Sequence, residues 1–558
     1  MATGPFRLNL ALRAGNLKGR NNTHNKESAH PSIRTPFGRT DKFRGYKKKF
    51  VKFIHMKKSI SIQLALMILI VMQATGQTGG IKVIPGTKVT LNQGSTLKIT
   101  DGGNLLLQDD LSTAPSFLQR GTLTFAGGGE SEVEQYLPKD AWHIVASPVQ
   151  DEVIGAYMWM YLYRYAEPAA SWQYLSQPVS TPLNVGEGYF VWPYTTDPNG
   201  TYPPSPDSAV LNGTLNYQTV NDYSLSYTAS SPNPGWNLVG NPFPCAINWN
   251  SSTDWDRNNV DATVYVYDNG AGGGSSGNYR IYNWNTGIGI PTGNDGIIAS
   301  TQGFWLHANN TGARVDIPQS QRLHSNKTFF KNTDDEWDNL LRLRVDEKSS
   351  TLFYETLIAF SEEATGGFDA MFDGAFLEGK DDAPQFYTVT ANEMYSVNFL
   401  PSYEDYSIVP LNFKSVNTGE YTITASNIES FPAGLPVYLE DKKENVFHNL
   451  RANPEYIFIW EVGDNSSRFN VHFADPLGNS ENGFAAGIQI YAYEKTVYVN
   501  IPFEVNGDIL IYNLPGEQVI SQKALKGLNS IPVWNNNIYL IVKIISGNRA
   551  TTGKVFIK

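Results

Sequence analysis

The sequence predicts an all-β, multidomain protein. Its 558 residues exceed the length of one typical domain. Aromatic residues make up 13% of the chain, and glycines and prolines separate many short runs in which apolar and polar residues alternate. Alternation with a period of two predicts strands, and Gly and Pro predict the turns between them. We expect a β-ladder or meander, then a duplicated β unit, a β-sandwich and a small C-terminal sandwich.

Charge is unevenly distributed along the chain. Residues 1–55 carry 13 Lys or Arg against two acidic residues, whereas residues 78–558 carry 28 basic and 51 acidic residues, a net charge of −23 (28 − 51). We therefore expect no binding of nucleic acid. The single cysteine, Cys245, excludes an intrachain disulfide framework and a multi-cysteine zinc site. It has no basic activator nearby in the sequence, so we expect an inert thiol.

Residues 56–76 have the features of a signal peptide. A basic head, Met56-Lys57-Lys58, precedes a short apolar run and small residues, after which we expect cleavage between Gly76 and Gln77. The apolar run is shorter than the roughly 20 residues of a membrane-spanning helix, so we expect no integral membrane span. Residues 1–55 lie upstream of a complete signal, which indicates a mis-assigned start; a basic targeting arm is the alternative. The expected location is secreted or cell-surface, reached through the periplasm.

Residues 78–130 consist of short alternating runs, such as KVTL, TLKI and GTLTF, that glycines separate. Each glycine can supply the positive φ of a tight turn, and each alternating residue can enter a shared core. This rhythm predicts either stacked β-rungs or a meander.

Residues 131–330 contain an internal duplication. WHIVASP (142–148) recurs as WNLVGNP (236–242), and LNVGEGYFV (183–191) aligns without a gap to IASTQGFWL (298–306). Each copy has too few apolar positions to bury both faces of its strands, so we expect the copies to share one sheet system or to pack face to face. In YMWMYLYRY (157–165), aromatics occupy every second position, and apolar Met and Leu residues occupy most of the positions between them. One aromatic row would then lie outside the core unless another sheet covers it.

Five residues of the second copy are candidates for a sugar-binding platform: Trp236, Asn241, Trp249, Trp255 and Trp284. Indole rings can stack on the apolar faces of sugar rings, while an amide can bond to sugar hydroxyls. The alternative is a structural role, with the first tryptophan buried and the Gly-Asn-Pro segment fixing a turn.

Residues 336–475 predict a β-sandwich of seven strands, among them FYETLIAF and YIFIWEV. An acidic segment between strands contains Asp369 and Asp373. Their carboxylates are candidate calcium ligands, although the ligand spacing of a helical calcium loop is absent. Turn capping is the alternative, and we expect no other cofactor.

After a linker at 476–487, residues 488–558 form a last compact unit. Three of its segments are Ile511-Tyr512-Asn513, Ile538-Tyr539 with Lys543, and the closing GKVFIK (553–558). In these segments the unit resembles the type A C-terminal sorting domain of cargo proteins of the type IX secretion system. The resemblance implies a small Ig-like β-sandwich and the outer-membrane type IX machinery as partner. The residues it implies for the sorting signal are Tyr539, Lys543, Gly553, Lys554 and Lys558. The Asn-Pro dipeptide that commonly opens such a domain is missing.

The expected function is that of a secreted or cell-surface β-rich binding or structural protein exported by type IX secretion, adhesin-like or glycan-binding, with polysaccharide or matrix as a partner. No Gly-x-Ser-x-Gly, His-Glu-x-x-His or Cys/His signature supports an enzyme, so we assign no catalytic residue. One alternative is a secreted hydrolase acting on polysaccharide or protein, which would need two carboxyl groups facing each other across a cleft. The other is a passive module of an envelope assembly, which would show a broad apolar patch.

Overall fold

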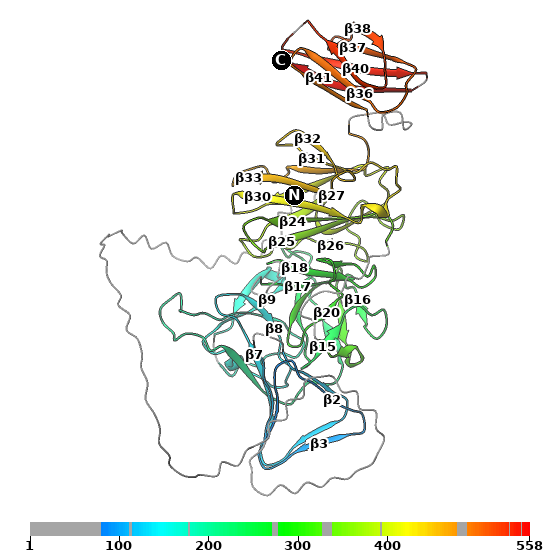
Figure 1. Cartoon of the computed structure of the whole chain (residues 1–558). Coiled ribbons are helices and arrows are strands. Elements are labelled where there is room, and N and C mark those ends of the chain that lie inside the picture. Colours follow the sequence, from blue (N-terminus) through cyan, green and yellow to red (C-terminus); the bar gives the residue numbers. More distant parts are fainter. Residues whose placement is uncertain are drawn as a thin grey trace, which may run out of the picture. The chain divides into compact units, whose positions relative to one another are not determined.

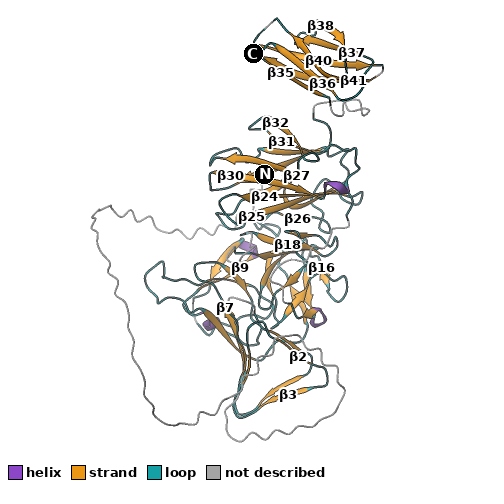
Figure 2. Cartoon of the chain, in the orientation of Figure 1, coloured by secondary structure: helices purple, strands orange, loops and turns teal. Residues whose placement is uncertain are grey.

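The computed structural model describes residues 80–110, 114–176, 179–269, 277–325, 337–390, 393–476, 488–534, 536–547 and 549–558. Within these ranges the all-β prediction is confirmed: strands dominate, and the helical elements are short 3₁₀ turns (Figure 2). None of the described helical elements is long and apolar enough to cross a membrane. The predicted upstream extension, signal peptide and cleavage site at Gly76 and Gln77, and nearly all of the predicted linker, lie outside the described residues.

The N-terminal ladder consists of stacked rungs, not a meander (Figure 1). Its parallel pairs are β1 (Ile81–Val83) with β4 (Leu105–Leu107), β4 with β7 (Ser131–Tyr136), β2 (Lys88–Leu91) with β5 (Ser116–Gln119), and β3 (Thr96–Ile99) with β6 (Thr122–Phe125). Each strand pairs with its counterpart one turn later, so the chain winds as a β-helix. Val83, Leu107 and Val133 lie in register and are buried. Gly129 sits at a corner where a Cβ would lie 2.0 Å from the Gly103 carbonyl oxygen.

The predicted duplication is confirmed by the strand order of two sheets. The first copy has the order β10 (Ser171–Tyr174), β9 (Tyr161–Ala166), β11 (Tyr189–Trp192), β8 (His143–Val145). The second has the order β18 (Tyr279–Asn283), β17 (Thr263–Tyr267), β21 (Gly303–His307), β14 (Trp236–Gly240), with β19 (Gly289–Ile290) added beside β18. Each strand of the first copy therefore has a counterpart at the same place in the second.

The two copies exchange equivalent backbone contacts. Val145 of the first copy bridges Gln302 of the second, and Val239 of the second bridges Glu187 of the first. In the ungapped alignment Val145 corresponds to Val239 and Glu187 corresponds to Gln302. Reciprocal contacts of this kind define a pseudo-two-fold axis between the copies, as in a symmetric dimer.

The same axis explains why Gly240, a residue without a side chain, lies where the two copies meet. The backbone N–H of Ala146 donates to the Thr301 carbonyl and that of Gly240 donates to the Gly186 carbonyl, each at 2.8 Å. A Cβ on Gly240 would lie 2.4 Å from the Cβ of Ala146. The joint therefore accepts one methyl group at this pair of positions and excludes a second.

Short strands complete the duplicated domain. β12 (Ser208–Gly213) pairs antiparallel with β7 and so ends the β-helix. The remaining strands form two small sheets: β13 (Val220–Ser224), β22 (Arg314–Ile317) and β16 (Arg257–Asn258), and β20 (Ile297–Ile298), β15 (Ala246–Asn248) and β23 (Arg322–Leu323). The core of the second copy includes residues from both of these sheets.

Residues 337–476 form one continuous sheet of eleven described strands where the sequence predicted a two-sheet sandwich. The path runs β32 (Val446–Asn449), β31 (Tyr438–Asp441), β34 (Phe469–His472), β29 (Ile408–Lys414), β27 (Gln385–Thr390), β28 (Glu393–Leu400), β25 (Phe353–Phe360), β24 (Leu340–Glu347), β30 (Gly419–Ser426), β33 (Glu455–Trp460), with β26 (Gly374–Ala375) beside β28. The sheet curls into a nearly closed barrel around one core. Its two halves thus face each other, as the layers of a sandwich would.

A buried arginine joins the two ends of the barrel sheet. The Arg468 guanidinium donates to both carboxylate oxygens of Asp441 on β31, at 2.8 and 2.6 Å, and to the Ile459 carbonyl of β33 at 2.7 Å. Both charged side chains are 1% exposed. Because a bidentate pair of this kind satisfies the buried charges, it closes the seam without leaving an unpaired ion.

The C-terminal unit has its own core. One sheet contains β35 (Gln489–Tyr493), β36 (Thr496–Ile501) and β39 (Gly527–Pro532), and the other contains β38 (Gln518–Lys523), β37 (Asp508–Asn513), β40 (Ile538–Ser546) and β41 (Arg549–Ile557). Inward residues of both sheets, including Val499, Ile511 and Val542, form one cluster. The predicted small C-terminal sandwich is therefore confirmed.

Candidate functional site

The tryptophans of the predicted sugar platform enclose a side chain of the protein itself. Trp249 and Trp255 are buried and Trp284 is half-buried. The guanidinium carbon of Arg257 lies 4.2, 5.1 and 4.6 Å from the centroids of these three rings. Arg257 also donates to the backbone oxygens of Trp249 and Ser251, and burial lowers its pKa to about 9. The cluster is a cation–π cage already filled by arginine, and it offers no open platform to a sugar.

Trp236 and Asn241 have structural roles. Trp236 is 7% exposed and packs edge-on against Tyr265, with ring centroids 5.1 Å apart. The Asn241 side chain donates to the Cys245 and Ala299 carbonyls and accepts the Phe243 N–H. Asn241 therefore fixes the Gly-Asn-Pro turn. Cys245 is buried, and burial raises its thiol pKa to about 12, in keeping with an inert thiol.

The acidic candidates for calcium cap a loop. Asp369 accepts the Thr365 N–H and hydroxyl, while the fully buried Asp373 accepts the N–H groups of Asp369 and Phe399. Burial raises the pKa of Asp373 to about 8, although its hydrogen bonds act in the opposite direction. Both carboxylate oxygens of Asp373 are thus engaged by backbone N–H groups, as turn capping requires. Among the described residues, no group of three or more His, Cys, Asp or Glu is placed to hold a metal.

The residues implied for the sorting signal gather on the last two strands. Tyr539 pairs with Phe556 across β40 and β41, and the Lys554 ammonium lies 4.3 Å from the Tyr539 ring centroid. By alternation Lys543 shares the outer face of Tyr539. Gly553 faces inward, where a Cβ would meet Ile490. Lys558, the last residue, is exposed.

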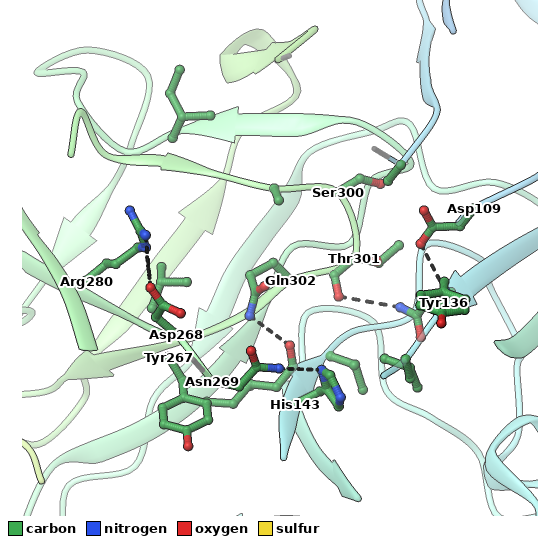
Figure 3. A pocket seen from close by; sticks show the side chains of 18 of the residues that line it. Asp109, Tyr136, His143, Tyr267, Asp268, Asn269, Arg280, Ser300, Thr301 and Gln302 are labelled. Carbon is green, nitrogen blue, oxygen red and sulfur yellow. Dashed lines mark hydrogen bonds and ion pairs between the residues drawn. The ribbon is translucent and has the colours of Figure 1, made fainter. Parts of the chain in front are cut away.

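A polar cavity of 380 Å³ lies where the end of the β-helix and both copies meet (Figure 3). His143 uses Nε2 to bond the Pro138 carbonyl at 2.8 Å, and its Nδ1 lies 3.1 Å from the Asn269 amide nitrogen. Burial lowers the pKa of His143, so the neutral ring donates through one nitrogen and accepts through the other. On the opposite wall Arg280 forms a 2.9 Å ion pair with Asp268.

Asp109 also lines this cavity, and its carboxyl group has a raised pKa. It accepts the N–H groups of Tyr136 and Asp110, and burial raises its pKa to about 6. No cysteine or lysine is among the described residues that line the cavity, and the Ser300 hydroxyl donates to the Phe243 carbonyl. The polar groups here hold three segments together, and they do not form a nucleophile with its base.

The outer aromatic faces of the two copies differ in what covers them. Tyr163 pairs with Phe190 in the first copy and Tyr265 pairs with Trp305 at the equivalent place in the second. Tyr265 is fully buried, because the barrel segment that contains Asp373 covers it: its hydroxyl accepts the Ala375 N–H at 2.8 Å. Tyr163 is half-buried. Tyr161 and Trp192 beside it are likewise half-buried, so the first copy keeps a partly uncovered aromatic face, which we call the open face.

At one end of this open face lies an aromatic hollow of 260 Å³. We define the aromatic hollow by Trp159, Tyr161, Tyr174 and Tyr202. Trp159 is 41% exposed, Tyr174 48% and Tyr202 50%, and the Trp159 and Tyr202 rings lie 5.4 Å apart. Large aromatic side chains with this much exposure, gathered around a concavity, mark a binding surface.

A buried carboxylate holds the hollow in shape. Asp197 accepts the Tyr161 hydroxyl at 2.7 Å and the N–H groups of Asn199, Thr201 and Tyr202. Burial alone would raise the pKa of Asp197, but these donors lower it to about 2. Because the carboxylate stays ionised, it fixes the loop that carries Tyr202.

The sequence prediction did not name the residues of the hollow. It placed the candidate site on tryptophans of the second copy, all of which serve the core. The signal that pointed to the first copy was the run at residues 157–165, in which aromatics occupy every second position. In β9 this aromatic row, which consists of Tyr161, Tyr163 and Tyr165, is half-buried, whereas Leu162 between them is buried.

Comparison with known families gives one match. A model described as a domain of unknown function, DUF8693, matches residues 55–473, a range that takes in the β-helix, both copies and the barrel. Residues 488–558 lie beyond it. No curated protein matches the chain. Since the match covers most of the sequence, the chain belongs to the DUF8693 family.

Proposed function

We propose that the protein is a secreted or cell-surface binding protein that contacts its ligand through the open aromatic face of the first copy. One observation carries the proposal: of two sheets with the same strand order, one is covered by the barrel, and the other is only partly covered and lies beside a hollow lined by exposed Trp and Tyr side chains. Exposed aromatic groups of this size stay uncovered in soluble proteins chiefly where a partner binds them.

The C-terminal unit supports the proposed location. It has a core of its own, and its outer face presents Tyr539, whose ring contacts both the Lys554 ammonium and the Phe556 ring. Its resemblance to type IX sorting domains makes the outer-membrane machinery its proposed partner. The acidic charge of residues 78–558 disfavours anionic partners such as nucleic acid. The proposed ligand is a polysaccharide or matrix polymer.

Fractionation of a host that has type IX secretion tests the location. The full chain should be recovered outside the cell or on its surface, and a chain without residues 488–558 should remain in the periplasm. A Tyr539→Ala/Lys554→Ala variant should reduce surface recovery, while Tyr493→Ala, which changes another exposed tyrosine of the same unit, should not. Unchanged extracellular recovery of the truncated chain would contradict the proposal.

Retention on extracellular material tests the binding role separately. The purified full chain should adhere to extracellular polymeric material prepared from the producing cells. Tyr163→Ala combined with Tyr174→Ala should weaken adhesion, because it strips the open face, whereas Trp534→Ala on the C-terminal unit should not. Equal adhesion of all three proteins would refute a binding role for the open face.

A further inference from the structure

We propose that the aromatic hollow of the first copy binds one ring of a neutral carbohydrate, stacked on Trp159. The inference rests on the proposed binding role of the open face and names the class of ligand. The C–H groups on the flat side of a pyranose ring suit the negative face of an indole, and the hydroxyl groups at the rim need hydrogen-bonding partners. The hollow supplies both, as its parts show in turn.

Trp159 is presented by a strained turn. Its φ is +67°, a conformation that is rare for a bulky residue. The turn is fixed on both sides, since the Met160 N–H donates to the Tyr157 carbonyl at 3.1 Å and the Ser205 hydroxyl donates to the Trp159 carbonyl. Strain of this kind persists where the surroundings hold it, and it is common at ligand sites. The indole is therefore displayed to solvent by a rigid backbone.

Two tyrosines provide the polar rim. Tyr202 is held against Trp159 because the Asp197 carboxylate accepts its backbone N–H at 2.9 Å. Tyr174 packs on Tyr161 with ring centroids 5.8 Å apart. A tyrosine offers an apolar ring and a hydroxyl that donates and accepts, so it can bond to sugar hydroxyls without a large loss of side-chain entropy. The concavity thus combines ring faces with hydroxyl groups.

The charges around the hollow select a neutral ligand. The described residues that line it are uncharged. The adjacent carboxylate, Asp197, is already engaged by four donors, and the described lining residues include no lysine or arginine that could pair with a uronate, sulfate or phosphate. The net charge of −23 (28 − 51) on residues 78–558 would also repel a polyanion. These features favour a neutral polysaccharide over an acidic one.

The second copy cannot repeat this site. At the strand that corresponds to the open face, the Thr263 hydroxyl donates to the Asp373 carbonyl at 2.7 Å and the Tyr265 hydroxyl accepts the Ala375 N–H. The barrel thus occupies the place that a ligand would take. We expect one sugar site for the two copies.

Affinity electrophoresis of the full chain tests the proposal. Separate gels contain mannan, laminarin or xyloglucan as neutral polymers and alginate as an anionic one. Wild-type protein should be retarded by at least one neutral polymer and not by alginate. Trp159→Gly should need at least a tenfold higher polymer concentration for half-maximal retardation. Glycine suits the positive φ, so this variant removes the ring without adding backbone strain.

Two further variants serve as a second probe and a control. Tyr202→Ala should also weaken retardation, through loss of the second ring wall. Trp534→Ala removes an indole that is 89% exposed on the C-terminal unit and should behave as wild type. If Trp159→Gly and Tyr202→Ala both migrate as wild type in the gel that retards the wild type, the assigned site is wrong.

The outcomes separate this inference from the proposed function. If no neutral polymer retards the wild type, or if alginate alone does, the carbohydrate class is overturned. The binding role of the open face still stands in that case, provided that Trp159→Gly lowers adhesion to extracellular material. If no variant of the open face changes that adhesion either, the proposed function fails together with the inference.

Discussion

The two copies of the duplicated unit share one strand order, yet they bury their outer aromatic faces to different extents. In the second copy Tyr265 is fully buried under the barrel, whereas its counterpart Tyr163 in the first copy is half-buried. Duplication thus produced two equivalent faces, and the following domain covers one of them. The comparison teaches that the same aromatic pattern can serve a core in one place and an accessible surface in another, according to what packs against it.

The largest expected effect comes from truncating the two equivalent tyrosines. Tyr265→Ala should lower the free energy of unfolding by about 3–5 kcal/mol, the usual cost of removing a large buried aromatic side chain. Tyr163→Ala should lower it by about 1 kcal/mol, because the side chain is only partly buried. Urea unfolding of each variant measures the difference. Equal losses would show that the two faces are covered to the same degree.

A second test acts on the joint between the copies. Gly240→Ala should destabilise the protein by about 1–3 kcal/mol, because its new Cβ would lie 2.4 Å from the Ala146 Cβ. Adding Ala146→Gly removes that clash but leaves the 2.6 Å approach of the new Cβ to the Glu187 carbonyl oxygen, so it should restore stability in part. Thermal unfolding of the single and double variants gives the coupling. No rescue at all would argue against contact between these positions.

The third test changes the protonation of Asp373, which lies in the barrel segment that covers Tyr265 of the second copy. The pKa of Asp373 is about 8 in the folded protein, above its ordinary value of 3.8, so the folded state binds a proton more tightly than the unfolded state does. The stabilisation from this group is complete below about pH 4 and is lost as pH rises through 8. The unfolding free energy should therefore fall across this window, and Asp373→Asn should flatten the slope. A slope that the substitution leaves unchanged would contradict the assignment.

The smallest expected effect is the change in protein stability when the exposed tryptophan of the hollow is removed. Trp159→Gly should change the free energy of unfolding by no more than about 0.5 kcal/mol, since the ring is exposed and glycine tolerates the backbone angle. Urea unfolding beside Trp534→Ala provides the comparison. A loss of several kcal/mol would mean that Trp159 supports the core of the first copy.

The strands and the duplication were predictable because both depend on local patterns. Alternating residues and glycine corners define the rungs of residues 80–136, and the ungapped alignment of residues 183–191 with 298–306 defines equivalent strands. The alternation could not distinguish parallel rungs from an antiparallel meander, since strand direction depends on contacts between distant segments. It also could not show that the barrel strands form one sheet, because the seam depends on Arg468 reaching both Asp441 on β31 and Ile459 on β33, which are far apart in the strand order.

The candidate site was less predictable for a related reason. Tryptophans suit both a sugar platform and a core, and only the packing shows that Trp249 and Trp255 enclose Arg257. The exposure of Trp159 depends on a positive φ and on a loop held by Asp197, neither of which leaves a periodic signal in the sequence. The aromatic run at 157–165 did predict an uncovered row, but it could not show which copy the barrel covers.

Oxidative footprinting of the full chain with a retained neutral polysaccharide tests most directly whether the open face of the first copy binds the ligand. The account predicts that the polymer lowers the oxidation rates of Trp159, Tyr174 and Tyr202 and leaves that of the exposed Trp534 unchanged. Protection of Trp534 with no protection of Trp159 would contradict it.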